Sequence, residues 1–557
     1  MATSLPTYTG DMTALVRPTG HPVTDALIVG SKWGTGGAGT GATVTFSFPD
    51  AVDKFDKRDG VAGNYNPAEQ TQGGYAAYLQ GFVAFGAAEQ AAARQVLASW
   101  AAVANLQLVE VAATTVDAGV LRFGYTGGLG GTTYAVSAFP QDFAGAGDTW
   151  MNRAFLFPEG WAAGTQNFLT LLHEVGHAIG LKHPHDTGMS GEPGWPVNPA
   201  VLPKIGEDTL TGYSTQNMVM AYNDIPGMGA PLQADFAPTT PMKVDIDAIQ
   251  YLYGPNLAHN AGDTVYTYES AVRYNETVWD GGGNDTIEAS GMDDVGIDLT
   301  PGSWSIVGAP LTFSERDPAT LAVVGPRPDL TDPFTVYIYD TVLIENAIGG
   351  GGNDILLGNL ADNRLQGGAG NDALDGALGI DLAIYSAARA GAAFSVTATG
   401  FTVTSAADGT DALANVERLR FADTSVALDL PGNAGMVAKI LGSVFGRDAV
   451  SNEEYAGIGL YYIDGGMSYE SLMQLAIDAR LGAGASHHAV VDLLYTNVVG
   501  VPPGDVDRGY FVGLLDSGVY TVAGLGVMAA DIDLNVANIN LVGLAQQGLE
   551  YVPYLGG

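Results

Sequence analysis

The chain has 557 residues, and its 22 basic and 60 acidic side chains give a formal net charge of −38. This charge argues against duplex DNA and anionic membranes as partners, because phosphate groups attract clustered Lys and Arg. The hydrophobic fraction of 46% excludes a wholly disordered acidic chain, and the absence of Cys excludes disulfides, thiolate metal sites and cysteine nucleophiles. Asp outnumbers Glu by 43 to 17 and Gly reaches 77 residues, which favours calcium ligands and tight turns.

Residues 1–258 predict a globular unit that mixes helices and strands. Apolar periodicity predicts helices over Ala87–Leu106, Thr165–Leu181 and Val244–Leu252, and strands over Thr43–Phe48, Gln107–Val111, Val120–Tyr125 and Thr132–Phe139. The polar stretch Met1–Gly20 shows no secretory signal peptide. No apolar run reaches the ~18 residues of a membrane span.

The composition changes near residue 259. From 259 to 430, Gly, Asn and Asp punctuate single aliphatic residues, and this pattern is typical of short strands joined by turns. From 431 to 557 helical periodicity returns, in Met436–Phe445, Tyr469–Ala479, His488–Leu494 and Tyr510–Leu515. We therefore expect three domains, with boundaries at 1–258, 259–430 and 431–557.

The strongest chemical signal is a histidine motif inside the predicted helix Thr165–Leu181. His173 and His177 are four residues apart, so both imidazoles can face one metal ion, and Glu174 can act as a general base on water there. Gly180 can end the helix and turn the chain so that His183 becomes the third ligand. Three imidazoles leave a fourth position open, which is the pattern of a catalytic zinc site.

The alternative is a helix that carries histidines by coincidence. Only eight His occur in the chain, yet four of them, His173, His177, His183 and His185, fall within thirteen positions. For this composition, a chance match to three His, one Glu and one Gly at these spacings is on the order of 1 in 10⁵.

The extended motif resembles that of the metzincin endopeptidases, and its surroundings resemble the serralysin subfamily. That resemblance implies an α+β protease domain with a methionine turn beneath the zinc, here Met218–Tyr222, with Met220 as its floor. It also implies that Tyr222 approaches the zinc and stabilises the oxyanion. Asp208–Ser214, Asp25–Trp33 and Asp245–Gly254 resemble serralysins too. Ala221 replaces the usual Ser, and the loop Thr187–Ile205, which bears on the rim of the cleft, is longer than is typical of that family.

Four consecutive nine-residue units begin at Gly349, Gly358, Gly367 and Gly376 and match the pattern of calcium-binding nonapeptide repeats. In each unit six residues form a turn and three form a short strand, so alternate units stack on the same face of a parallel β-roll. The inward aliphatic residues are Leu356, Leu365, Leu374 and Ala383. The expected calcium ligands are the turn carbonyls and carboxylates of Gly350, Gly352, Asp354, Asn363, Gly367, Ala369, Gly370, Asp372 and Asp381. Asp354 with Asp372 is the stronger face, since Asn363 supplies only an amide opposite Asp381. A flexible loop is the competing interpretation.

An isolated match to the repeat, Asp280–Asp285, precedes these units. The resemblance to serralysins implies that it caps the roll and binds calcium together with the chain just upstream and with a Glu before the first unit. The residues concerned are Asn260, Gly262, Thr264, Asp280, Gly282, Gly283, Asp285 and Glu345.

Residues 431–557 resemble an all-α module appended to many bacterial secreted and surface-layer proteins, whose role is poorly defined. The adjacent pair His487–His488 faces two sides of a helix, so a solvated turn is a better interpretation than a metal site.

The leading hypothesis is a secreted zinc-dependent endopeptidase of serralysin type, stabilised by several calcium ions and acting on protein or peptide substrates. The resemblance implies export by a type I transporter without a cleavable signal peptide; whether Met1–Gly20 is a propeptide stays open. The alternative is a non-enzymatic, calcium-dependent cell-surface or surface-layer protein that binds a partner through its C-terminal module. Casein hydrolysis with and without a chelator separates the two.

Overall fold

The computed structural model describes residues 13–17, 19–55, 77–115, 118–130, 133–141, 144–184, 214–222 and 232–556. The predicted loop Thr187–Ile205, His185 and most of the segment Asp208–Ser214 lie outside these ranges. The chain divides into two compact units. The first holds the described residues of 1–264 with 269–283 and 301–342, and the second holds 265–268, 284–300 and 343–557.

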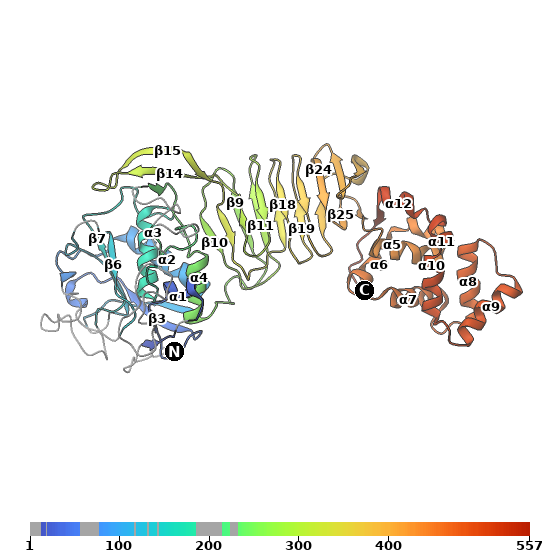
Figure 1. The fold of residues 1–557 in the computed structure, drawn as a ribbon, viewed down its shortest axis with the longest axis horizontal. Helices are drawn as coiled ribbons and strands as arrows, with labels where there is room; N and C mark the ends of the chain where they lie inside the picture. The colour runs from blue at the N-terminus through green and yellow to red at the C-terminus, as the bar shows by residue number, and fades with distance from the viewer. Residues whose placement is uncertain are drawn as a thin grey trace. The chain divides into compact units, whose positions relative to one another are not determined.

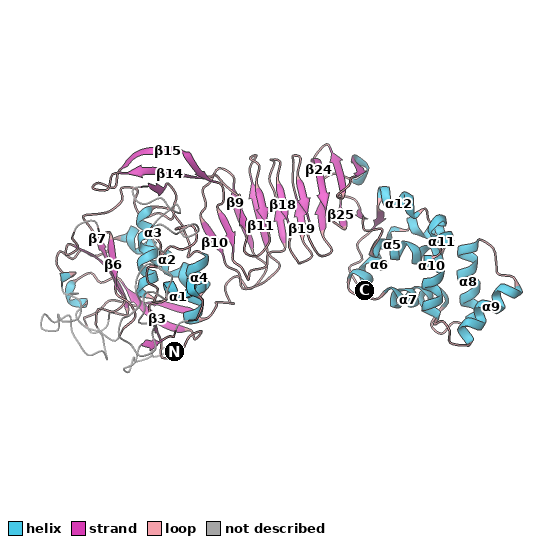
Figure 2. Ribbon diagram, viewed as in Figure 1, coloured by secondary structure: helices cyan, strands magenta, loops and turns pink. Residues whose placement is uncertain are grey.

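The first unit is built on a five-stranded, mostly parallel sheet with helices packed beside it (Figures 1 and 2). The strand order is β4–β3–β5–β7–β6, and only the β6–β7 pair is antiparallel. The strands are β3 (Ala42–Ser47), β4 (Leu106–Glu110), β5 (Leu121–Thr126), β6 (Ala135–Ser137) and β7 (Asp148–Asn152). The helices are α1 (Pro22–Leu27), α2 (Ala87–Val103), α3 (Gln166–Ala178) and α4 (Lys243–Tyr253). The three predicted helices and the predicted strands of this region are confirmed within a few residues.

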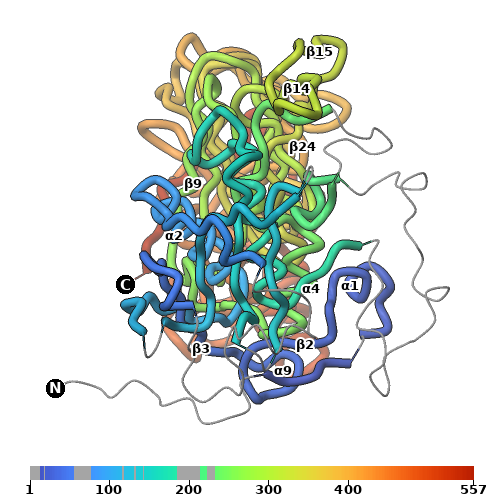
Figure 3. The backbone as a smooth tube through the Cα atoms, turned by 90° about the vertical axis from the view of Figure 1, so that its left-hand side faces the viewer, coloured from blue at the N-terminus to red at the C-terminus, as the bar shows by residue number. Residues whose placement is uncertain are grey.

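The core of this unit fixes the position of α3. Trp100 of α2 is fully buried, and its indole Nε1 donates to the carbonyl of Leu172 in α3 at 3.1 Å. Trp33 does the same to Ala178, the last residue of α3, at 2.7 Å. The described residues of this unit also form three smaller groups of strands, and the backbone is traced in Figure 3. These are β1 (Thr13–Leu15) with β2 (Ser31–Trp33); β8 (Leu232–Ala234) with β14 (Leu311–Arg316) and β15 (Val323–Asp332); and β10 (Glu276–Val278) with β13 (Trp304–Ser305) and β16 (Val336–Ile338).

The second unit contains the predicted parallel roll, made of two facing sheets (Figure 2). One sheet has the order β27–β26–β25–β21–β19–β17–β11–β9, and the other has the order β12–β18–β20–β24–β23–β22. Their bounds are β9 (Val265–Glu269), β11 (Thr286–Ser290), β12 (Gly296–Asp298), β17 (Asn346–Ile348), β18 (Ile355–Leu357), β19 (Arg364–Gln366), β20 (Ala373–Asp375), β21 (Leu382–Ile384), β22 (Ala392–Val396), β23 (Phe401–Ser405), β24 (Gly409–Ala414), β25 (Arg418–Arg420), β26 (Ser425–Ala427) and β27 (Leu549–Tyr551).

The strand register confirms how the nonapeptide units stack. Leu356 of unit one pairs with Leu374 of unit three, and Leu365 of unit two pairs with Ala383 of unit four, all in parallel. Each of these four residues is at most 2% exposed. Each of these four repeat strands buries only its central side chain, so the aliphatic ladder supplies the apolar core and the turns must be held by other means.

The C-terminal part of the second unit is helical and has its own apolar core, as predicted. The helices are α5 (Asn433–Ile440), continued by a π-helical turn (Leu441–Phe445), α6 (Glu453–Asp464), α7 (Tyr469–Leu481), α8 (His487–Val499), α9 (Asp505–Asp516), α10 (Val522–Asp531), α11 (Asp533–Asn538) and α12 (Leu541–Gln547). The predicted all-α character is wrong at the end of the chain. Strand β27 buries Leu549 and Tyr551 with Glu550 outside, and it pairs antiparallel with β26 of the roll.

Candidate metal centre and calcium turns

Helix α3 presents His173 and His177 on one face because they are four residues apart. Thr165 caps the helix by accepting from the backbone N–H of Phe168. His173 and His177 are 8% and 5% exposed. The helix therefore holds both imidazoles largely shielded from bulk solvent.

The end of α3 brings the third histidine back. The helix stops at Ala178, and Gly180 takes a φ of +117°, a region that disfavours residues with a side chain. A Cβ on Gly180 would also lie 2.7 Å from the carbonyl oxygen of Ser31. His183 follows this turn and lies beside the two helical histidines, as the position of the glycine predicted.

The three imidazoles converge through their Nε2 atoms. Nε2 of His183 lies 3.0 Å from Nε2 of His173 and 3.1 Å from Nε2 of His177. Nitrogens bound tetrahedrally to zinc at about 2.0–2.1 Å lie about 3.3 Å apart, so this spacing fits a shared metal ion. Within the described part of the chain, these residues form the one group of three or more His, Asp or Glu side chains able to share a metal ion.

Main-chain carbonyls set the protonation of two of these rings. Nδ1 of His173 contacts the carbonyl oxygen of Val219 at 2.8 Å, and Nδ1 of His177 contacts that of Leu181 at 2.8 Å. A carbonyl oxygen only accepts, so each Nδ1 carries the proton and each Nε2 presents a lone pair to the centre of the cluster. Neutral imidazoles with this orientation are the ligands that zinc requires.

Glu174 is buried beside the cluster. It is 5% exposed, and its Oε2 atom has no hydrogen-bond partner among the described residues. Burial raises the pKa of Glu174 to about 8, and a hydrogen bond with Ser137 opposes that rise. A dication held by the three imidazoles would lower the pKa again, because it favours the carboxylate. The residue is therefore suited to exchange a proton near neutral pH.

The turn beneath the cluster packs tightly against α3. Met220 is fully buried, and a Cβ on Gly176 would lie 2.5 Å from its sulfur atom. Asp245 of α4 holds the turn in place, since its carboxylate accepts from the backbone N–H of Val219 at 2.6 Å and of Met242 at 3.0 Å. Sequence reasoning missed this role of Asp245. Its burial was readable from the α4 pattern, but its partner, 26 residues away, was not.

Tyr222 also contacts the cluster. Its hydroxyl lies 2.6 Å from Nε2 of His183, and the two ring centroids are 4.4 Å apart. The residue is 63% exposed. The phenol can therefore meet a ligand that approaches from solvent.

The carboxylates of the repeats form a column on the first face of the roll. Asp372 Oδ1 accepts from the backbone N–H of Asp354 at 2.8 Å, and Asp354 Oδ1 accepts from Val295 at 2.9 Å. Carbonyl oxygens of glycines in one turn also lie close to the glycines of the next turn. A Cβ on Gly370 would lie 1.8 Å from the oxygen of Gly352, a Cβ on Gly368 would lie 2.0 Å from that of Gly350, and Gly350 also accepts from Ala369 N–H. Side-chain and main-chain oxygens thus accumulate between successive turns.

The second face repeats the arrangement with different residues. Asp381 Oδ1 accepts from the backbone N–H of Asn363 at 2.7 Å, and Glu345 Oε2 accepts from that of Asp285 at 2.7 Å. Burial raises the pKa of Asp381 to about 7, with repulsion from Glu417 as a further cause. Burial likewise raises the pKa of Asp354 and Asp372 on the first face. Each shift reports a carboxylate that lacks a compensating positive charge.

The remaining predicted ligands lie in the first unit, except Asp285 and Gly367, which lie in the second. Thr264 Oγ1 donates to the carbonyl of Gly262 at 2.8 Å, and Asp280 Oδ1 accepts from Gly282 N–H at 2.7 Å. Asn260 has a φ of +49° and Gly283 a φ of +159°. These contacts define two tight turns. Gly367 stands beside Asp372, because a Cβ on it would lie 2.0 Å from Asp372 Oδ2.

Two acidic residues in these columns escaped the sequence reasoning. Asp411 Oδ1 accepts from Asp372 N–H at 2.9 Å, and Glu417 Oε2 accepts from Asp381 N–H at 2.9 Å. The available signal was a buried aliphatic residue two residues further on, Leu413 or Leu419, as in each repeat. Neither residue sits in a complete nine-residue unit, which hid the pattern.

Three histidines that converge beside a buried carboxylate are typical of a histidine metal centre. In this chain the centre is accompanied by a β-roll with stacked acidic turns. Comparison with known proteins adds to this. The RTX calcium-binding nonapeptide repeat matches residues 271–295 and 348–383 in four copies.

Relatives that match the chain carry the names Serralysin, Serralysin G and Metalloprotease AprA. This chain is 34% identical over 356 residues to Serralysin of Proteus mirabilis, and the match covers 59% of this chain and 61% of the relative. It is 33% identical over 311 residues to Metalloprotease AprA of Pseudomonas entomophila (strain L48), covering 52% and 57%. Serralysin G of Dickeya chrysanthemi is 31% identical over 347 residues, covering 59% and 62%. The chain spans about three fifths of the length of these relatives.

The chain therefore resembles the serralysin-type RTX metalloproteases, with a helical module at its C-terminal end. Its repeats are calcium-binding repeats by family. Among the helices of the described residues, none combines the length and apolar character needed to cross a bilayer.

Proposed function

We propose that this chain is a secreted zinc-dependent endopeptidase that hydrolyses peptide bonds of protein substrates and is stabilised by calcium. The observation that carries the proposal is the convergence of three imidazole Nε2 atoms, two of them orientated by main-chain carbonyls, beside the buried carboxylate of Glu174. The similarity to Serralysin and Metalloprotease AprA supports the same activity.

In this proposal each residue has one task. His173, His177 and His183 hold the zinc ion, which when bound supplies a Lewis acid that polarises the peptide carbonyl and acidifies water. Glu174 accepts a proton from the attacking water and delivers it to the departing amine nitrogen. The Tyr222 hydroxyl donates a hydrogen bond to the carbonyl oxygen as negative charge develops there.

The remaining parts of the chain receive supporting roles. We assign residues 1–258 to a protease domain of metzincin type, 259–430 to a calcium-binding roll and 431–557 to a helical module. Calcium ions bound by the acidic turns would let the roll fold in a calcium-rich extracellular medium. Export by a type I transporter, as expected for a chain with RTX repeats, is part of the proposal.

The test is casein hydrolysis by the full chain in saturating calcium. Adding 1,10-phenanthroline, which removes zinc but leaves calcium, should abolish hydrolysis, and excess zinc should restore it. The Glu174→Ala protein should hydrolyse casein about 10²–10⁴-fold more slowly although it binds zinc. Hydrolysis that persists without zinc, or at the wild-type rate in the Glu174→Ala protein, would refute the proposal.

A further inference from the structure

The acidic columns of the roll continue beyond the matched repeats, which end at residue 383. Strand β25 follows β21 in the first sheet, with Leu419 paired to Ala383 in parallel. Glu417, immediately before β25, occupies the place that Asp381 occupies immediately before β21. It makes the equivalent contact, since its Oε2 accepts from Asp381 N–H just as Asp381 Oδ1 accepts from Asn363 N–H.

Main-chain oxygens repeat the same geometry at this turn. In the first nonapeptide repeat, a Cβ on Gly349 would lie 2.3 Å from Asp354 Oδ2 and 2.4 Å from the carbonyl oxygen of Gly367. In the fourth nonapeptide repeat, a Cβ on Gly376 would lie 2.4 Å from Asp381 Oδ2 and 2.2 Å from the carbonyl oxygen of Asn415. Asn415 thus stands where the next repeat would place its first glycine. It adopts a φ of +49°, as a tight turn requires.

The carboxylate of Asp381 is buried at this turn among other acidic groups. Asp381 is 1% exposed, and its Oδ2 atom has no hydrogen-bond partner in the described part of the chain. Glu417, Asp362 and Asp375 all repel it. Asp362 and Asp375 accept from the backbone N–H of Ile380 and Ala377, and as carboxylates they add negative charge near Asp381. A buried carboxylate oxygen among further oxygens is a place for a hard cation.

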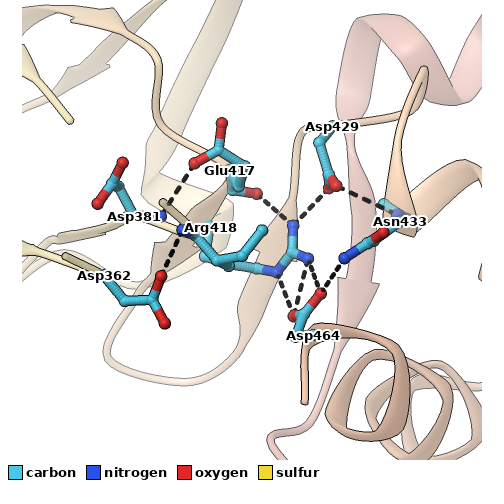
Figure 4. A network of polar contacts seen from close by, with 9 residues as sticks. Asp362, Asp381, Glu417, Arg418, Asp429, Asn433 and Asp464 are labelled. Carbon is cyan, nitrogen blue, oxygen red and sulfur yellow. Dashed lines mark hydrogen bonds and ion pairs between the residues drawn. The ribbon is translucent and has the colours of Figure 1, made fainter. Parts of the chain in front are cut away.

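The guanidinium of Arg418, the residue after Glu417, is engaged elsewhere. Arg418 is 4% exposed and directs its guanidinium to Asp464 at the end of α6 and to Asp429 (Figure 4). Asn433 of α5 donates to the same Asp464 carboxylate at 2.9 Å. Arg418 therefore fastens the last parallel turn of the roll to the helical module, while its backbone N–H is held by the carbonyl of Asp381 at 2.9 Å.

We propose that the turn formed by Asp381, Asn415 and Glu417 binds a calcium ion of its own, and that this ion couples the roll to the helical module through Arg418. The ion would tie the segment 415–417 to the turn of Asp381, which fixes the backbone from which Arg418 extends. The helices α5 and α6 would then dock on a roll whose end is ordered only when calcium is bound.

The first test counts calcium ions on the full chain by equilibrium dialysis. Glu417→Gln should bind one calcium ion fewer than the wild type at a concentration that saturates the repeats. The matched control is Glu454→Gln, since Glu454 is exposed on α6 and should leave the count unchanged. Because Glu417→Gln keeps the length and an acceptor oxygen, its fold can be checked by circular dichroism. A folded Glu417→Gln protein with the wild-type count would overturn the site.

The second test reads the coupling by amide hydrogen exchange of α6 in saturating calcium. Glu417→Gln should raise the exchange rate of residues 453–464 about tenfold. Arg418→Met should raise it similarly while it leaves the calcium count unchanged. Protection of α6 that is equal in the wild type with calcium and with chelator would overturn the coupling. Neither readout involves hydrolysis, so failure here is distinct from failure of the proposed protease function.

Discussion

The histidine centre and the acidic turns of the roll differ in how their candidate metal ligands are held in the absence of a metal ion. Around the histidines, two Nδ1 atoms are satisfied by main-chain carbonyls and the helix that carries them is buried in an apolar core. In the roll, buried carboxylates such as Asp372 and Asp381 keep an oxygen atom without a hydrogen-bond partner in the described residues. The first arrangement can stand without its metal, whereas the second gathers negative charge that a cation must neutralise.

The comparison teaches that burial has different consequences for neutral and charged ligands. A neutral imidazole can be buried at little cost once one ring nitrogen donates to a carbonyl. A buried carboxylate needs an opposite charge, and three-residue strands offer too little apolar surface to compensate for its absence. We therefore expect variants of the histidine centre to lose activity while folded, and variants of the roll to lose calcium-dependent structure.

The largest expected effect comes from Glu174→Ala. Removal of the proton carrier should lower the rate of casein hydrolysis by about 10²–10⁴-fold, because general base catalysis typically contributes that much. Zinc content, measured on the purified protein, should stay at one ion per chain, since Glu174 is not a ligand. Zinc lost together with activity would show that its role is misassigned.

Tyr222→Phe should cost less. The phenol ring and its packing on His183 are kept, and only the hydroxyl that lies 2.6 Å from Nε2 is removed. Loss of one oxyanion donor should lower kcat by about 10–10³-fold with a smaller change in KM. Peptide hydrolysis kinetics measure both constants, and an unchanged kcat would show that the Tyr222 hydroxyl takes no part in the reaction.

Asp245→Ala tests whether the turn beneath the histidines is preorganised. Without the carboxylate, the N–H of Val219 loses its partner, and the carbonyl of Val219 that orientates His173 is less firmly held. Zinc affinity, measured by competition with a chelating dye, should fall about 10–100-fold, as for other partners of metal ligands. Asp247→Ala is the matched control, because Asp247 bonds Tyr339 instead. Equal affinities in both variants would contradict the role of Asp245.

The smallest expected effect is the difference between a variant on the first face of the roll, Asp372→Ala, and one on the second face, Asp381→Ala. Asp372 lies between two carboxylates, Asp354 and Asp411, whereas Asp381 lies between the amide Asn363 and Glu417. Asp372→Ala should therefore raise the calcium midpoint of folding, followed by circular dichroism, by about tenfold, and by more than Asp381→Ala does. Asp448→Ala, at a side chain 98% exposed, serves as control. If Asp372→Ala left the calcium midpoint of folding unchanged, these turns would be structural glycine turns rather than calcium sites.

Local patterns in the sequence were sufficient for much of this architecture. The spacing of His173, His177 and His183 around Gly180 predicts the cluster, and the period of nine predicts which strands pair. What the sequence does not reveal depends on distant partners or broken periods. β27 pairs with β26 across more than 120 residues of helices, and Asp245 acts on a turn that only the fold brings to it. Glu417 follows a turn too short to read as a repeat.

Amide hydrogen exchange of the full chain, compared in calcium plus zinc and in a chelator that removes both ions, tests the central contrast most directly. Helix α3, residues 166–178, should keep most of its protection in chelator, because its core and the carbonyl partners of its histidines remain. The repeat strands between 346 and 384 should lose theirs. A roll that stays protected in chelator, or an α3 that loses protection together with the roll, would contradict the account.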